Sequence, residues 1–136
     1  MIDLKRLHEE PDYRAAIERK RVDPDLLDRV LAADAARRAQ LRVVEELRTR
    51  QNAASKEIGR AAPEDRPDKI AAAGALKEEL QALEDTLTQL DMEVRALALL
   101  VPNAADASVP DGGEDDGEVL RVVGDTPAPP PLDHAA

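Results

Sequence analysis

The 136-residue sequence contains no cysteine, tryptophan or phenylalanine, and Tyr13 is its one tyrosine. The absence of cysteine excludes disulfides, thiolate metal sites and cysteine nucleophiles. With so few aromatic rings, the chain can neither fill a thick globular interior nor stack unpaired bases as single-strand-binding proteins do. A compact enzyme domain with a deep pocket is therefore not expected.

Long apolar segments are also missing. The chain is charged from Asp3 onward, which does not fit a secretory signal. The longest stretch without a charged side chain, 96–105, has ten residues, whereas a membrane-spanning helix needs about 17 to 25. We therefore expect a soluble, cytoplasmic protein without a membrane partner.

Few residues are suited to catalysis or to metal binding. His8 and His134 are far apart in sequence, and no HExxH motif is present. Gly112 and Gly113 lie among carboxylates that would repel a phosphate group, so they do not form a phosphate-binding loop. The acidic run at 114–116 does not have the spacing of a calcium loop. We expect no cofactor and no metal ion in this chain.

The net charge of −10 is distributed unevenly. Residues 27–62 carry eight Lys or Arg against five Asp or Glu, which gives +3, whereas residues 63–101 and 102–136 give −5 and −7. Seven of the eight cations in the positive segment are Arg, the side chain best suited to forked contacts with phosphate. A solvated helix face would have the same composition, so charge alone leaves both interpretations open. The overall negative charge argues against a nonspecific DNA-binding protein.

Leucine and valine recur at alternating spacings of four and three in the second half of the chain, which is typical of a coiled-coil helix. This seam consists of Leu76, Leu80, Leu83, Leu87, Leu90, Val94, Leu97 and Val101. Asp65 and Pro67 are suited to the first turn of the helix, with Asp65 as N-cap, and Pro102 ends it.

The segment 26–59 is also predicted to be helical, because it contains no proline or glycine before position 59. On the same repeat its seam is half polar and reads Leu27, Val30, Asp34, Arg37, Leu41, Val44, Arg48, Gln51, Ser55 and Ile58. Such a helix is suited to pair with the Leu-rich one, with the stems of Arg37 and Arg48 covering its leucines. The link at 59–67 is short enough to force an antiparallel hairpin.

The predicted fold class is therefore all-α, a long antiparallel two-helix coiled-coil hairpin at 26–101 with short helices in residues 1–25. One of these, at 11–21, is expected to pack against the base of the hairpin. We divide the chain into an arm, residues 1–103, and an acidic linker rich in proline and glycine, residues 104–136. Within the linker we expect a short strand at 118–123 and an extended proline-rich stretch at 127–131.

Short stretches along the whole chain resemble, in order and spacing, the N-terminal domain of seryl-tRNA synthetase, the serine–tRNA ligase of class II. They are MIDLK at 1–5, DAARR at 34–38, EEL at 45–47, NAASKEIG at 52–59, VPN at 101–103, SVP at 108–110, EDD at 114–116, EV at 118–119 and PLDH at 131–134. The sequence departs from the family at Gln51, where Arg is usual. The class II motifs that bind ATP and serine are missing from these 136 residues.

In that family the N-terminal coiled coil grips the long variable arm of serine tRNA and guides its acceptor end to an active site, typically of the other subunit of a dimer. The resemblance therefore implies that serine tRNA is the partner. It also implies that this chain alone is inactive and monomeric, because ATP, Mg and the main dimer contacts belong to the missing domain.

The RNA-contacting residues implied by this resemblance are the outward cations of the first helix, Arg29, Arg42, Arg50, Lys56 and Arg60. On the heptad repeat, Arg29, Arg50 and Arg60 point away from the partner helix. Arg42 and Lys56 lie on one flank, with Arg38 closer to the seam. The alternative is a stand-alone coiled-coil adaptor or chaperone-like hairpin, which would not require such unequal charge on its two helices.

Overall fold

The computed structural model describes residues 2–124. They fall into two units, the first ending at Asp106 and the second beginning at Ala107. The described residues form four α-helices and a 3-10 helix at Glu114–Asp116, and they contain no strand. The all-α prediction is confirmed. No helix in this described part is both long and apolar enough to cross a membrane.

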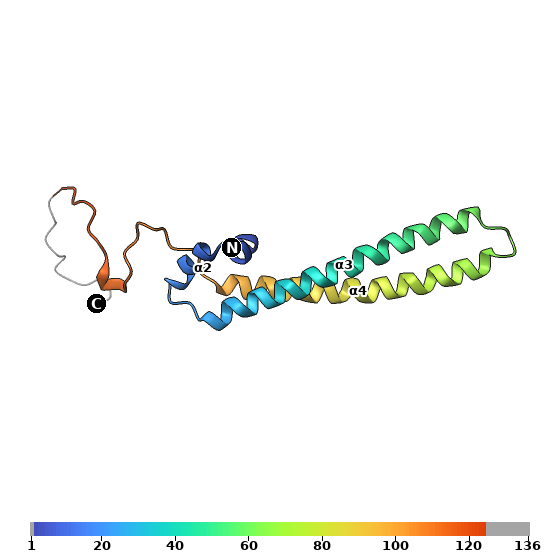
Figure 1. Ribbon diagram of the computed structural model, residues 1–136, viewed down its shortest axis with the longest axis horizontal. Helices are drawn as coiled ribbons and strands as arrows, with labels where there is room; N and C mark the ends of the chain where they lie inside the picture. The colour runs from blue at the N-terminus through green and yellow to red at the C-terminus, as the bar shows by residue number, and fades with distance from the viewer. Residues whose placement is uncertain (1, 125–136) are drawn as a thin grey trace, which may run out of the picture. The chain divides into compact units, whose positions relative to one another are not determined.

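Two long antiparallel helices, α3 (Pro24–Arg60) and α4 (Arg66–Leu100), lie side by side and form the predicted hairpin (Figure 1). Helix α3 begins where the Asp23 carboxylate accepts a hydrogen bond from the Asp25 amide at 3.0 Å, with Pro24 in the first turn. Asp65 occupies the N-cap position of α4, as predicted, although its side chain makes no capping hydrogen bond.

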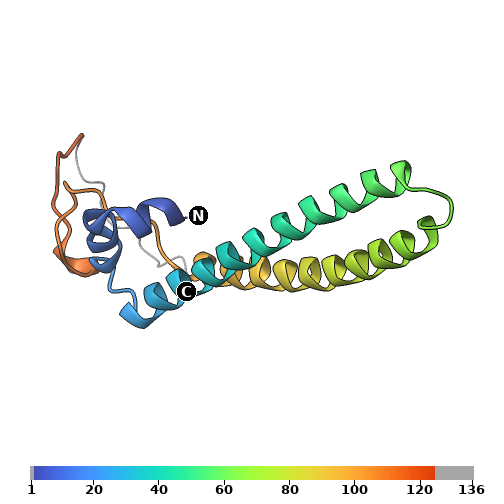
Figure 2. The same cartoon turned by 45° about the vertical axis from the view of Figure 1, so that its right-hand side comes forward.

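Two short helices, α1 (Leu4–Glu9) and α2 (Pro11–Glu18), lie at the open end of the hairpin (Figure 2). They contribute Leu7 and Ile17 to a core that includes Leu27 of α3 and Val94 of α4. The predicted packing of the helix at 11–21 against the base of the hairpin is confirmed, since Ile17 belongs to this core. The segment after α4 returns along α2, where the Ala105 amide donates to the Ala16 carbonyl at 2.9 Å.

The seam of α4 agrees with the predicted heptads, but the seam of α3 departs from them in its outer half. Leu47 is buried and Ala54 half-buried, whereas Arg48 and Ser55, which the heptad repeat placed inside, are exposed. The buried and half-buried positions that follow the α3 seam are Leu27, Val30, Asp34, Arg37, Leu41, Val44, Leu47, Gln51, Ala54 and Ile58. A straight α-helix drifts against an exact seven-residue repeat, so the face turned to α4 moves by one position along the rod.

The second unit, residues 107–124, has little regular structure. Val119, Leu120, Val122 and Val123 are exposed, and the strand predicted at 118–123 is absent, so that prediction is wrong. A segment rich in valine forms a strand only when another strand completes the hydrogen bonds, and none is present in the described residues. The proline-rich stretch at 127–131, His134 and the PLDH motif lie outside the described residues.

Candidate nucleic-acid interface

The eight cations of residues 27–62 all project from α3, and ion pairing divides them into two groups. Three are engaged by carboxylates: Arg37 and Arg38 by Asp34, and Arg48 by Glu84. The other five are exposed, and none makes a hydrogen bond or ion pair with the residues that the structure describes. These are Arg29, Arg42, Arg50, Lys56 and Arg60, the predicted set. Their role in RNA contact remains a prediction.

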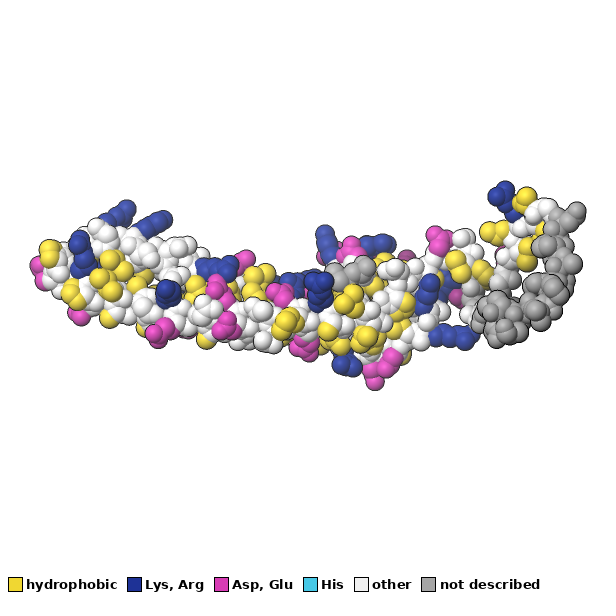
Figure 3. All heavy atoms as spheres, turned by 180° about the vertical axis from the view of Figure 1, so that it is seen from behind, with side chains coloured by type: hydrophobic (Ala, Val, Ile, Leu, Met, Phe, Trp, Pro, Cys, Tyr) yellow, Lys and Arg dark blue, Asp and Glu magenta, His cyan; other side chains and the backbone are white. Residues whose placement is uncertain are grey.

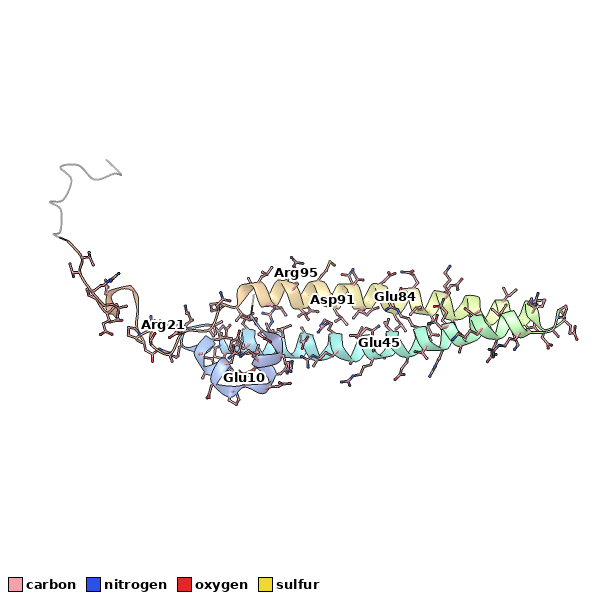
Figure 4. All side chains as sticks on the ribbon, turned by 90° about the horizontal axis from the view of Figure 1, so that it is seen from above. Glu10, Arg21, Glu45, Glu84, Asp91 and Arg95 are labelled. Carbon is pink, nitrogen blue, oxygen red and sulfur yellow. The ribbon has the colours of Figure 1, made fainter. Side chains whose placement is uncertain are left out.

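The engaged arginines hold α3 to its neighbours. Nη2 of Arg48 lies 2.6 Å from Oε1 of Glu84, and Nη1 of Arg37 lies 3.6 Å from Oδ1 of Asp91. Both acids are on α4 (Figure 4). The side chain of Arg48 is 54% exposed, so it does not cover the leucines of α4 as the heptad interpretation predicted. It lies outside the seam because Leu47 has taken the inner position.

Asp34 is the one buried charged side chain among the described residues, and it ties together the base of the arm. Its carboxylate accepts from Nη2 of Arg37 at 2.8 Å and Nε of Arg38 at 2.7 Å, and it shares a 3.0 Å hydrogen bond with Nε2 of His8 on α1. Burial alone would raise the pKa of Asp34. Hydrogen bonds from Arg37 and His8 and the charge of Arg38 outweigh burial, so the pKa is lowered.

The five exposed cations do not share one side of α3. Residues 18 apart in an α-helix are five full turns apart and face the same way, which places Arg42 and Arg60 on one side. Lys56 lies one turn before Arg60 and joins them. Arg42 and Lys56 therefore lie on the outer side of α3 and not on a flank as predicted, because the residues one turn before and after each of them are exposed.

Arg50 lies elsewhere on α3, although the heptad repeat predicted that it points away from α4. It follows buried Leu47 by three residues and precedes half-buried Ala54 by four, so it is next to the seam. It lines a shallow pocket between the helices together with Val43, Glu46, Leu47, Glu79 and Leu83. Arg29 is also turned away from the side that carries Arg42 and Arg60.

Arg38, which the sequence interpretation placed closer to the seam, lies one turn before Arg42 and 18 residues before Lys56, so it shares their side of a straight helix. It also borders the seam, four residues after buried Asp34 and three before half-buried Leu41. The sequence contains the information that these four cations share a side, because the separations 38–42, 42–60 and 56–60 are those of one face of a straight helix. The heptad repeat obscured it. Lys and Arg side chains project along the α3 edge toward the tip of the hairpin (Figure 3).

Comparisons with known proteins match one family over most of the chain. A family model described as "Seryl-tRNA synthetase N-terminal domain" matches residues 1–105. A serine–tRNA ligase of Mycobacterium avium is 44% identical over 136 residues, which cover 98% of this chain and 32% of the relative. One of Beutenbergia cavernae is 44% identical over 125 residues, 91% of this chain and 30% of the relative. The chain spans about a third of the length of these relatives.

Proposed function

Because the chain belongs to the family of seryl-tRNA synthetase N-terminal domains, we propose that it is a tRNA-binding arm that recognises the long variable arm of serine tRNA. In this proposal it positions the tRNA for serylation by a catalytic domain that these 136 residues do not include. Cytoplasmic location, and a homodimer formed by the full-length enzyme, belong to the same proposal. Family membership supports the tRNA-binding role, and the charges of α3 support the way in which it is performed.

The observation that carries this proposal is the set of exposed, unpaired cations on α3 in a chain whose net charge is −10. In our proposal the candidates for these contacts are Arg29, Arg42, Arg50, Lys56 and Arg60. At 1.5 Å per residue, α3 extends about 55 Å, long enough to lie along an RNA stem. Packing against α4 keeps these side chains at fixed separations.

Recognition of this kind depends on the position of phosphates and not on base identity. Arg and Lys bind phosphate through charge and hydrogen bonds, and such contacts fix where an RNA lies without reading its sequence. With Tyr13 as the one tyrosine and no Phe or Trp, stacking on splayed bases has no support. This chemistry suits an RNA that is distinguished by an additional stem.

We expect the 136-residue chain to bind serine tRNA with a dissociation constant in the micromolar range or weaker at physiological salt, because the acidic α4 opposes the RNA. Fluorescence anisotropy should show weaker binding when the long variable arm is shortened and the rest of the tRNA is kept. The titration is made at two salt concentrations, since phosphate contacts make affinity salt-dependent.

Lys77→Ala with Arg95→Ala is the control for lost charge, because both side chains are exposed on α4. This double variant should keep the preference for the intact variable arm. Equal affinity of the parent chain for the two RNAs would contradict the proposal and favour the adaptor alternative.

A further inference from the structure

We propose that RNA contacts the arm on one side of α3 and at two points, through a set of four cations that we call the outer row. The outer row consists of Arg38, Arg42, Lys56 and Arg60. This inference rests on the proposed function and narrows it, since it assigns the contacts to one side and excludes Arg29 and Arg50 from them.

The outer row is made of two pairs. Arg38 and Arg42 are one helical turn apart near the middle of α3, and Lys56 and Arg60 are one turn apart at its tip. The 14 residues from Arg42 to Lys56 correspond to a rise of about 21 Å. A stiff polyanion that lies along this side can therefore place two separated phosphates on the two pairs.

Arg38 remains available to RNA although it is bonded to Asp34. Its Nε donates to the buried carboxylate at 2.7 Å, while 43% of its side chain is exposed. A guanidinium has five N–H donors, and the contact with Asp34 uses the one on Nε. Asp34 thus fixes the direction of Arg38 and leaves the outer nitrogens of the guanidinium for a phosphate.

The middle of the same side repels phosphate. Glu45 follows Arg42 by three residues and is exposed on α3, where it is labelled in Figure 4. Thr49, one turn further on, turns its hydroxyl back to the Glu45 carbonyl at 2.9 Å. Neither side chain offers a cation to RNA, so contact is restricted to the two ends of the row.

The two excluded arginines are placed beside carboxylates. Arg50 lines the pocket between the helices with Glu46 and Glu79, whose charges weaken its attraction for phosphate. Arg29 follows Asp25 by one helical turn. On the outer row, Arg42 also has Glu45 and Glu46 one turn further on. At the tip the nearest acid is Glu57, and its Oε2 lies 3.4 Å from Nζ of Lys69 on α4, an ion pair that partly offsets its charge.

Two double variants with equal loss of charge test the assignment. Arg42→Ala with Arg60→Ala removes one cation from each end of the outer row, and Arg29→Ala with Arg50→Ala removes two cations from the other sides of the same helix. All four side chains are exposed, and circular dichroism checks that helix content is unchanged. Binding of serine tRNA is followed by fluorescence anisotropy between low and physiological salt.

We expect the outer-row variant to weaken binding roughly tenfold at low salt and to flatten the salt dependence by up to about 1.8 logarithmic units, that is, about 0.9 for each phosphate contact. The Arg29/Arg50 variant should lose no more than about threefold, with a nearly unchanged slope. Glu45→Gln should tighten binding.

The outcomes separate this inference from the proposed function. If the Arg29/Arg50 variant loses as much affinity as the outer-row variant or more, while the parent still prefers the intact variable arm, the assignment to one side of α3 is overturned and the tRNA-binding role stands. If the parent chain shows no preference for the intact variable arm, both proposals fail.

Discussion

Replacing Leu47 by Ala is expected to lower the free energy of unfolding by about 2–3 kcal/mol. Leu47 is 5% exposed and packs with Val44 of its own helix and Leu80 of α4. Truncation removes apolar contacts and leaves a void that two long helices cannot easily close, because the rest of the seam holds their separation. Urea unfolding followed by circular dichroism measures the change.

Arg48→Ala is the matched control, one residue further along α3. The Arg48 side chain is 54% exposed and its partner Glu84 is 30% exposed, so loss of this ion pair should cost no more than about 1 kcal/mol. A larger loss at Arg48 than at Leu47 would mean that the heptad repeat, and not the shifted seam, describes the packing of α3 on α4.

Asp34→Asn is expected to destabilise the arm by about 1–3 kcal/mol, because hydrogen bonds to a charged carboxylate are replaced by those of a neutral amide. The loss is moderate, since Arg37 and Arg38 are partly exposed and can turn to water. Asp91→Asn provides the comparison, because Asp91 is 56% exposed and 3.6 Å from Arg37, and it should cost less than about 1 kcal/mol.

The stability of the parent chain and of Asp34→Asn can also be compared as a function of pH. The pKa of Asp34 is lower in the folded chain than its ordinary value, so its contribution to stability is present above about pH 4 and is lost as pH falls further, through the folded pKa. The difference in unfolding free energy between parent and Asp34→Asn should therefore shrink from pH 4 downward. A difference that grows over this range would show that the ionised carboxylate is not what stabilises the base.

The helices of this protein are determined by its sequence. Unbroken helix formers, prolines at positions 24, 67 and 102, and the leucine spacing of α4 limit where a helix can begin and end. The family is also apparent from the sequence, because its short motifs occur in order, and the comparisons confirm it. The strand at 118–123 was wrongly predicted because local propensity says nothing about whether a pairing partner exists.

The sequence likewise determines only part of the candidate site. The sequence alone places an excess of cations on α3, but it cannot tell which of them carboxylates engage. Asp34 meets His8 of α1, and Arg48 meets Glu84 of α4, so both pairings depend on helices that are distant in sequence.

Which side of α3 faces α4 was likewise decided by tertiary packing. Half of the seam positions predicted for α3 are polar, so the pattern by itself does not distinguish Arg48 from Leu47 as the inner residue. The two positions differ by one residue, about 100° around the helix, and burial of leucine against Leu80 settles the choice. That rotation turns Lys56 outward and brings Arg50 next to the seam, because every side chain on a rigid helix moves with the face that is buried.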